Sequence, residues 1–396
     1  MWGRVLCLAA LSLPAIAGAH DGPAEVEASY ASAPGCATAE ASIDFDFEGA
    51  SQSTCVIEGA RAFRIVVSPE HAPPINPSPW YAFRYQAAPG PDVTISIDYL
   101  FGEHRYVPKL TDAEGTRVLV FEEEAEGKVA TFAIPPGAGL VSGQEVFDAA
   151  RYERGYERLE RSDHVSRTTI GQSRDGNAIV GLRMGNPQAP HLIVLLGRAH
   201  PPEVSGAIAM EAFLETLVEL YDSGDIDPAK FQVLAVPLLN PDGVMRGHWR
   251  ANLGGLDLNR DWGLFTQPET AAVGRWLDAL GADAKPVAMI DFHSTQSNLF
   301  YVQGADETDA AQEDFLQDWL GRSMGGFDEY PFRIERRNAN PGSGPSKNWF
   351  NARFGIPAYT YEVGDETDRT ATADAARVFA RTLVPAIDTL LDANSE

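Results

Sequence analysis

A stiff corner, His200-Pro201-Pro202-Glu203, separates an apolar run from a helical pattern. The apolar run covers residues 192–196, and from residue 203 to residue 221 apolar side chains recur on one helical face. Two consecutive prolines fix φ at two positions and restrict the residue ahead of them. The corner therefore predicts a buried strand that turns directly into a helix. It also places a histidine and a carboxylate where both can bind one metal ion, and a catalytic zinc site needs three such protein ligands.

The same alternation continues through the C-terminal part of the chain. Helical patterns cover residues 149–159, 203–221, 268–280 and 372–391, and short apolar runs cover residues 192–196, 233–236, 287–290 and 358–361. Strands that alternate with helices are typical of an α/β fold. We therefore predict an α/β domain over residues 149–396, with a largely parallel or mixed sheet flanked by helices.

The N-terminal part has a different period. Val93, Ile95, Ile97 and Tyr99 alternate with polar residues, and several similar segments are separated by turns rich in proline and glycine. Short strands with regular turns and no convincing helix predict an all-β sandwich over residues 40–134. The stretch that begins Pro135-Pro136-Gly137 is rich in glycine, so we predict a linker over residues 135–148.

The first residues have the pattern of a secretory signal peptide. Arg4 precedes an apolar run, and Ala17-Gly18-Ala19 fits a cleavage site of the A-x-A type. We therefore predict a signal peptide over residues 1–19 and a periplasmic or secreted location. No stretch of the chain is long and apolar enough to span a bilayer, so we expect no membrane insertion after cleavage.

Cleavage would remove Cys7 and leave two cysteines, Cys36 and Cys55. An even pair in an oxidising compartment predicts one disulfide bond, with two free thiols as the alternative.

The charge balance excludes two classes of partner. The chain has 56 acidic and 31 basic residues, a formal charge of −25. Such a charge argues against nucleic acid and anionic membrane surfaces as partners. It also opposes the long-range attraction of acidic substrates. The oligomeric state cannot be inferred from the sequence.

Polar residues with chemical potential follow each of the four apolar runs. They are His200, the segment Asn240-Pro241-Asp242-Gly243, the segment Asp291-Phe292-His293, and Glu362. Ligands in open α/β sheets gather beyond the carboxyl ends of the strands. Each signal alone has a structural explanation, such as a buried core histidine or an ordinary turn. Their recurrence at four strand ends predicts a functional site at this edge of the sheet.

Together these motifs resemble the zinc carboxypeptidases of the funnelin, or M14, family, over roughly residues 150–396. The resemblance implies a metallocarboxypeptidase with one Zn²⁺ per chain, acting on peptide or protein C-termini. His200 and Glu203 match the family's HxxE ligand pair, and His293 matches its third ligand. Glu362 matches the catalytic carboxylate, and Arg250 matches the arginine that polarises the scissile carbonyl group.

Further residues of this chain match functional positions of the family. Asn259 and Arg260 match the pair that holds the substrate's terminal carboxylate, where an arginine offers a bidentate fork. Asp257 resembles the carboxylate that orients the ring of the first histidine. Within the family the chain is most similar to the cytosolic carboxypeptidase subgroup, which has an N-terminal β-sandwich. The segments Asn76-Pro-Ser-Pro-Trp-Tyr-Ala-Phe83 and Tyr106-Val-Pro-Lys109 look like that subgroup's N-terminal domain.

The resemblance also bears on the preferred terminal residue. Lys347 lies fifteen positions before Glu362, where the family has the base of the pocket for the terminal side chain. A lysine there predicts an acidic terminal residue such as glutamate, and a solvent-exposed lysine is the alternative. Many family members carry a mobile tyrosine where this chain has Asn340, and neither Tyr359 nor Tyr361 can be assumed to replace it.

Two other functions remain open at this stage. One is a peptidase for the γ-D-glutamyl–diaminopimelate bond of murein peptides, which suits a periplasmic location. The other is a binding protein whose catalytic domain is inert, although the intact set of ligands, base and arginines argues against it.

Overall fold

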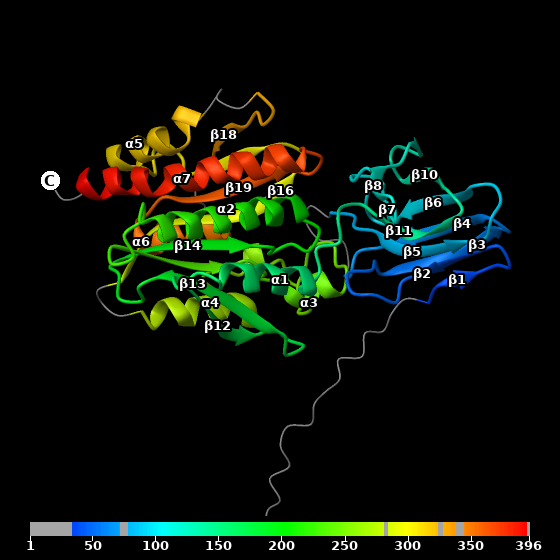
Figure 1. The fold of residues 1–396 in the computed structure, drawn as a ribbon, viewed down its shortest axis with the longest axis horizontal. Coiled ribbons are helices and arrows are strands. Elements are labelled where there is room, and N and C mark those ends of the chain that lie inside the picture. The colour runs from blue at the N-terminus through cyan, green and yellow to red at the C-terminus, as the bar shows by residue number, and fades with distance from the viewer. Residues whose placement is uncertain (1–33, 72–77, 281–283, 324–327, 338–343, 394–396) are drawn as a thin grey trace, which may run out of the picture. The chain divides into compact units, whose positions relative to one another are not determined.

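The computed structural model describes residues 34–71, 78–280, 284–323, 328–337 and 344–393 (Figure 1). The predicted signal peptide, residues 76–77 of the first family segment, and Asn340 lie outside these ranges. In the described residues, no helix is both long and apolar enough to cross a membrane.

Residues 36–142, here called the β domain, form two sheets. The first sheet contains, in spatial order, β1 (Cys36–Ala37), β2 (Ala41–Asp44), β5 (Ala82–Ala87), β11 (Gly137–Ser142), β7 (Lys109–Asp112) and β8 (Gly115–Val118). The second contains β3 (Ser53–Gly59), β4 (Ala62–Val67), β6 (Val93–Tyr99), β10 (Val129–Ile134) and β9 (Phe121–Glu124). Ile95 and Ile97 of β6 share one hydrophobic cluster with Phe83 of β5, so side chains from both sheets form a common core.

The boundaries predicted for this domain need correction at both ends. The predicted linker, residues 135–148, contains β11, which pairs with β5 and β7. A Cβ atom at Gly139 would lie 2.9 Å from the Leu110 side chain and 3.0 Å from the Tyr85 ring, so this strand needs a glycine for close packing. The glycines that made the segment resemble a linker are therefore part of the sheet. At the other end, β1 begins at Cys36 rather than at residue 40.

The predicted disulfide between Cys36 and Cys55 is present, with 5.8 Å between the two Cα atoms. Cys36 lies in β1 of the first sheet, and Cys55 lies in β3 of the second. The bond therefore joins the two sheets of the β domain covalently.

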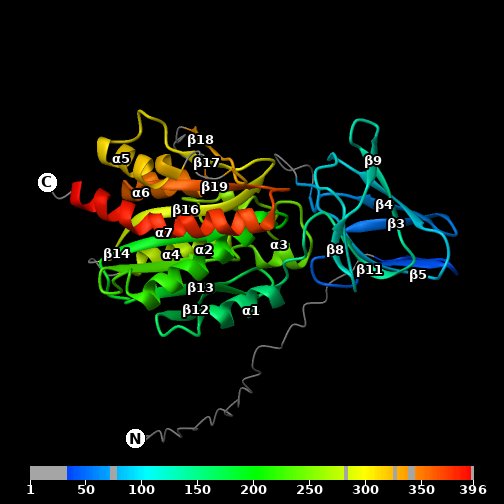
Figure 2. The same ribbon diagram turned by 45° about the horizontal axis from the view of Figure 1, so that its top comes forward.

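The remaining described residues form an α/β domain around one mixed sheet (Figures 1 and 2). Its strands are, in spatial order, β12 (Val165–Gln172), β13 (Ala178–Gly185), β15 (Phe231–Val236), β14 (His191–Gly197), β16 (Lys285–Thr295), β19 (Ala358–Gly364), β17 (Leu299–Val302) and β18 (Arg333–Arg336). The four central strands β15, β14, β16 and β19 are parallel, and β13 and β17 flank them antiparallel. This agrees with the predicted mixed sheet.

Helices cover both faces of this sheet. They are α1 (Ala149–Leu159), α2 (Val204–Ser223), α3 (Pro241–Met245), α4 (Pro268–Asp278), α5 (Ala310–Trp319), α6 (Ser346–Phe354) and α7 (Arg369–Ala393). Ile193 of β14 shares a hydrophobic cluster with Phe213 of α2, whereas its neighbour Leu192 shares a second cluster with Val273 of α4. Burial on both faces explains why the central strands are continuous apolar runs rather than alternating ones.

The four predicted apolar runs correspond to β14, β15, β16 and β19. Because these strands are parallel, their carboxyl ends meet at one edge of the sheet. β16 and β19 extend past His293 and Glu362 to Thr295 and Gly364, so both residues lie within strands rather than after them.

Candidate active site

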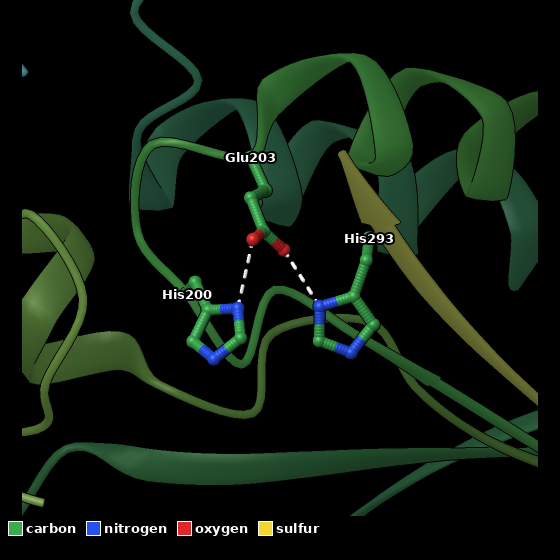
Figure 3. A group of neighbouring side chains, drawn as sticks. All are labelled: His200, Glu203 and His293. Carbon is green, nitrogen blue, oxygen red and sulfur yellow. Dashed lines mark hydrogen bonds and ion pairs between the residues drawn. The ribbon is translucent and has the colours of Figure 1, made fainter. Parts of the chain in front are cut away.

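The three predicted metal ligands lie together (Figure 3). Nδ1 of His200 lies 2.8 Å from Oε1 of Glu203, and Nδ1 of His293 lies 2.7 Å from Oε2 of the same carboxylate. The candidate ligand atoms of the three residues all lie within 4.8 Å of one another. All three side chains are buried.

The corner between β14 and α2 is held from both sides. Arg198 has φ 54°, and its Nε donates to the carbonyl oxygen of Pro201 at 2.8 Å. The side-chain amide of Asn240 donates to the carbonyl oxygen of Ala199 at 3.1 Å. The segment that begins at Asn240 is thus more than an ordinary turn, because its first residue fixes the backbone beside His200.

The third ligand and the catalytic carboxylate come from neighbouring strands. His293 of β16 and Glu362 of β19 are paired in the parallel register, so both side chains point to the same face. Oε2 of Glu362 is buried and has no hydrogen-bond partner among the described residues. A buried carboxylate oxygen without a partner is costly, and Glu362 lines the same cleft as the three ligands.

Each histidine is oriented by a second carboxylate. Nε2 of His200 lies 2.8 Å from Oδ1 of Asp257, and Nε2 of His293 lies 3.0 Å from Oδ2 of Asp291. Both Nε2 atoms therefore carry the proton as donors, and both Nδ1 atoms present a lone pair to a metal ion. The family resemblance predicts this role for Asp257, whereas no role was predicted for Asp291. The signal for Asp291 was available, because residues two apart in a strand share a face.

This arrangement fits a zinc ion. In the tautomers set by Asp257 and Asp291, lone pairs of two imidazole rings face the carboxylate oxygens of Glu203 at hydrogen-bond distance. Such a contact between acceptors requires a cation or protons between them. Two neutral imidazoles and one carboxylate are ligands that zinc prefers, and three protein ligands leave a position open for water.

The electrostatics of the site agree with a cation there. Burial alone would lower the pKa of His200 and of His293, but nearby carboxylates outweigh it and raise both pKa values above the usual range. Glu203 is a neighbour of both rings. For Glu203 burial acts to raise the pKa, yet the two histidines hold it well below its usual value. Since metal ligands must lose their protons, metal binding here should weaken in acid.

The pKa of Glu362 moves in the opposite direction. Burial raises it to about 7, against the opposing effect of His293. A carboxylate with a pKa near neutrality can both accept and return a proton at physiological pH.

A cleft of about 400 Å³ contains the predicted site residues. Its lining includes the three metal ligands and Glu362, together with Arg250, Asn259, Arg260 and Lys347. Asp257 is the one predicted site residue that does not line it, because Asp257 lies behind His200. The cleft is also lined by residues that the sequence analysis did not assign to the site: Arg105, Ser294, Thr295, Tyr301, Arg337, Pro345, Asn348 and Thr360.

The predicted substrate-binding residues are fixed by the protein to different degrees. Nε of Arg250 donates to Oδ2 of Asp257 at 2.7 Å, so Asp257 orients both this arginine and His200. Asn259 is held more fully, since its side-chain oxygen accepts from the backbone N–H of Ser346 at 2.9 Å. Arg260 is exposed, and one of its Nη atoms donates to the carbonyl oxygen of Asn259 at 2.7 Å.

Lys347 lies near the start of α6 and is 5% exposed. Its Nζ donates to the carbonyl oxygen of Arg337 at 2.9 Å, and burial lowers its pKa to about 8. The alternative of a solvent-exposed lysine is therefore wrong. Gly344, three residues ahead of Lys347, packs so closely on Arg260 that a Cβ would lie 2.3 Å from its carbonyl oxygen.

Two tyrosines considered as substitutes for the mobile one do not reach the cleft. Tyr359 is 2% exposed, and the Tyr361 hydroxyl lies 2.7 Å from that of Tyr330 in the core. Tyr301 does line the cleft, and its hydroxyl oxygen accepts a hydrogen bond from Arg337 at 3.3 Å.

Glu70 and Arg105 of the β domain lie close to the site. The Glu70 carboxylate accepts from the backbone N–H groups of Trp249, Arg250 and Ala251, at 2.7, 3.0 and 2.5 Å. Arg105 lines the cleft, and its Nε donates to Oδ2 of Asp365 at 2.8 Å, just beyond the end of β19. Nothing in the sequence pattern indicates Glu70, because its partners lie in another domain. Arg105 directly precedes the segment Tyr106-Val-Pro-Lys109 noted above.

Comparison with known proteins identifies the family. The sequence model of the zinc carboxypeptidase family, the M14 peptidases, matches residues 156–386, which is more than half of the chain. The chain belongs to this family. Curated relatives include cytosolic carboxypeptidase 2 of Danio rerio, which is 28% identical over 221 residues. They also include an uncharacterised protein of Zymomonas mobilis, ZMO1242, which is 29% identical over 195 residues.

These alignments are partial on both sides. The first covers 51% of this chain and 30% of the zebrafish protein, and the second covers 47% of this chain and 49% of the Zymomonas protein. The chain therefore spans less than half the length of these relatives.

Solved structures share the fold over most of the chain. A metallo-carboxypeptidase from Burkholderia cenocepacia has a TM-score of 0.74 at 16% identity and covers 88% of this chain and 99% of its own. A metallo-carboxypeptidase from Pseudomonas aeruginosa, in complex with (2-guanidinoethylmercapto)succinic acid, has a TM-score of 0.71 at 19% identity, with coverage of 88% and 99%. Coverage of this extent includes both the β domain and the α/β domain.

Proposed function

We propose that this protein is a zinc-dependent metallocarboxypeptidase that releases C-terminal amino acids from peptides or proteins. One observation carries the proposal. A single cleft contains the His200, Glu203 and His293 cluster, Glu362, whose Oε2 has no partner among the described residues, and cationic side chains that include Arg260 and Lys347. The metal-ligand cluster and Glu362 suit cleavage of a peptide bond, and the cations suit recognition of a chain terminus.

The residues of the chain divide the work of hydrolysis. A zinc ion held by His200, Glu203 and His293 would supply a Lewis acid and a water molecule of lowered pKa. Glu362 takes the proton of the attacking water and passes it to the leaving amine, which its raised pKa of about 7 favours. Arg250 donates to the carbonyl oxygen as negative charge develops, and its bond to Asp257 holds it ready for that role.

The cationic side chains recognise the end of the substrate. Arg260 offers its guanidinium group to the terminal carboxylate, in the bidentate geometry that arginine favours. Lys347 prefers an acidic terminal side chain, most simply glutamate. The net charge of −25 opposes this attraction at long range, but salt screens the outer field within about 8–10 Å. At contact distance, the attraction of the nearby cations for an acidic side chain outweighs this long-range repulsion.

We further propose that the protein works in the periplasm or outside the cell. The disulfide between Cys36 and Cys55 supports this location, because such bonds persist in oxidising compartments and are rare in the cytosol. Its partners there would be peptide or protein C-termini.

The direct test is product release from a panel of peptides that differ only in the terminal residue, with muropeptides assayed beside them. We expect one zinc ion per chain, release of the terminal amino acid, and the highest kcat/KM for terminal glutamate. Lys347→Glu should abolish that preference. Cleavage of the muropeptides alone would favour the murein peptidase, and zinc binding without any product would favour an inert binding protein.

A further inference from the structure

Residues of the β domain line most of a second cavity, which lies beside the candidate active-site cleft. This cavity has a volume of about 530 Å³ and is lined by Pro79, Phe101, Gly102, Glu103, His104, Arg105, Lys128, Thr295 and Gln296. All of these except Thr295 and Gln296 belong to the β domain. Arg105 and Thr295 also line the cleft, so the two hollows share a wall.

The chemistry of the cleft sets the direction in which a substrate must run. Under the proposed function, the terminal residue lies beside Arg260 and Lys347, and the scissile bond lies beside Glu362. Neither Arg260 nor Lys347 lines the second cavity. The chain on the N-terminal side of the scissile bond must therefore leave the cleft by another side, and the second cavity lies next to the cleft at Arg105 and Thr295.

The loop that lines this cavity is held in place. A Cβ atom at Gly102 would lie 2.9 Å from the Trp249 ring, so the loop packs directly against the residue that precedes Arg250. Lys128 donates to the carbonyl oxygen of Gly102 at 3.1 Å, and the backbone N–H of His104 donates to the carbonyl oxygen of Gly127 at 2.7 Å. The loop is thus tied both to the α/β domain and to the turn between β9 and β10 of its own sheet.

Phe101 is the unusual residue of this loop. It is 67% exposed, although phenylalanine is mostly buried in folded proteins. Its backbone has φ 62°, a conformation that bulky residues rarely adopt and that costs on the order of 1–3 kcal/mol. A strained backbone that presents an aromatic ring to solvent at the edge of a cavity requires an explanation beyond stability.

From these observations we propose that the second cavity binds the residues of the peptide that lie upstream of the scissile bond. This inference rests on the proposed function. An extended segment of the substrate passes Arg105 and Thr295, and an apolar side chain of that segment packs on the ring of Phe101. The β domain is then a substrate-binding part of the enzyme, and peptides long enough to reach Phe101 are preferred over dipeptides.

The test compares two substrates with the same C-terminal dipeptide. One is a blocked dipeptide, and the other is a blocked hexapeptide with leucine at the upstream positions. Both are assayed with the zinc-loaded wild type, with Phe101→Ser, and with Val120→Ser as the matched control. Val120 is 92% exposed in the β domain and lines neither hollow. Thermal midpoints of all three proteins show that folding is intact.

We expect the wild type to cleave the hexapeptide with a kcat/KM about tenfold higher than the dipeptide, since one well-packed aromatic contact is worth roughly that factor. Phe101→Ser should remove most of this gain and leave dipeptide cleavage unchanged, and Val120→Ser should change neither. Equal rates for both substrates in the wild type, or the same gain in Phe101→Ser, would overturn the proposed subsite while leaving the carboxypeptidase proposal intact. Failure to cleave either peptide would overturn the proposed function itself.

Discussion

The Glu70 carboxylate accepts a hydrogen bond from the backbone N–H of Arg250 at 3.0 Å, although the two residues are 180 positions apart in the sequence. It also accepts from the residues on either side of Arg250, so one carboxylate of the β domain fixes the backbone of that segment. Arg250 is the residue expected to meet the developing oxyanion. The β domain is therefore coupled directly to the proposed chemistry.

Loss of this contact should slow catalysis more than it weakens substrate binding. In Glu70→Ala the backbone around Arg250 loses three hydrogen bonds, and the guanidinium group moves from its place. Displacement of a catalytic group by about 1 Å can cost about 100-fold in rate. We expect kcat to fall about 10–100-fold, with a smaller change in KM and unchanged zinc content.

Glu58→Ala is the matched control, because Glu58 forms a partly exposed ion pair with Arg64 in the same domain. It should retain the kcat of the wild type. A wild-type kcat in Glu70→Ala would show that Arg250 does not depend on the β domain.

Asp291 should set the affinity for zinc through His293. Its carboxylate accepts the Nε2 proton and so fixes the tautomer and the orientation of the ring. Removal of such an outer partner typically costs 10–100-fold in metal affinity, so Asp291→Asn should weaken zinc binding by about that factor in a competition titration with a chelator. The control is Asp374→Asn, which changes an exposed residue of α7. Equal affinities in the two variants would refute the assigned role.

The preference for an acidic terminal residue should depend on pH. Burial lowers the pKa of Lys347 to about 8, so its side chain is cationic below that pH and neutral above it. The ratio of kcat/KM for terminal glutamate over terminal glutamine should therefore fall as the pH rises through about 8. Lys347→Arg should keep the ratio high across this range, because arginine stays charged. A ratio that is flat in the wild type would mean that Lys347 does not read the terminal side chain.

The disulfide should contribute measurably to the stability of the β domain. It joins residues separated by 19 positions, and closing a loop of this size is worth about 3 kcal/mol on the chain-entropy model. The double variant Cys36→Ser, Cys55→Ser should unfold at a lower urea concentration than the wild type. Addition of a reductant should lower the midpoint of the wild type but not that of the variant. Identical urea midpoints for the wild type and the double variant, both measured without reductant, would contradict this expectation.

Much of the α/β domain could be predicted because its signals are local. Two prolines fix the corner at His200, and continuous apolar runs mark strands buried on both faces. The same local order places His293 and Glu362 at the carboxyl ends of two such runs, whereas the pairing of β16 with β19 is seen only in the structure. The family resemblance then supplied roles for residues whose spacing alone is uninformative, such as Arg250 and Asn259.

The missed features depend on contacts between distant parts of the chain. Glu70 and Arg105 approach the site only because the β domain packs against the α/β domain, and no periodicity records that. In β11, close packing requires a glycine at position 139. In the sequence, such glycines are also typical of a linker. The outer strands β12, β13, β17 and β18 were not predicted either, and in β12 and β18 the exposed positions carry polar residues that leave no continuous apolar run.

The most direct test of the proposed carboxypeptidase activity is the rate at which the zinc-loaded protein releases the C-terminal glutamate of a peptide, measured for the wild type and for Glu362→Gln. The substitution keeps the shape of the side chain but removes the base. The account predicts steady release by the wild type and a rate lower by about 10²–10⁴-fold in Glu362→Gln, with zinc still bound. Equal rates in the two proteins, or a zinc-loaded wild type that releases no terminal residue from any peptide, would contradict it.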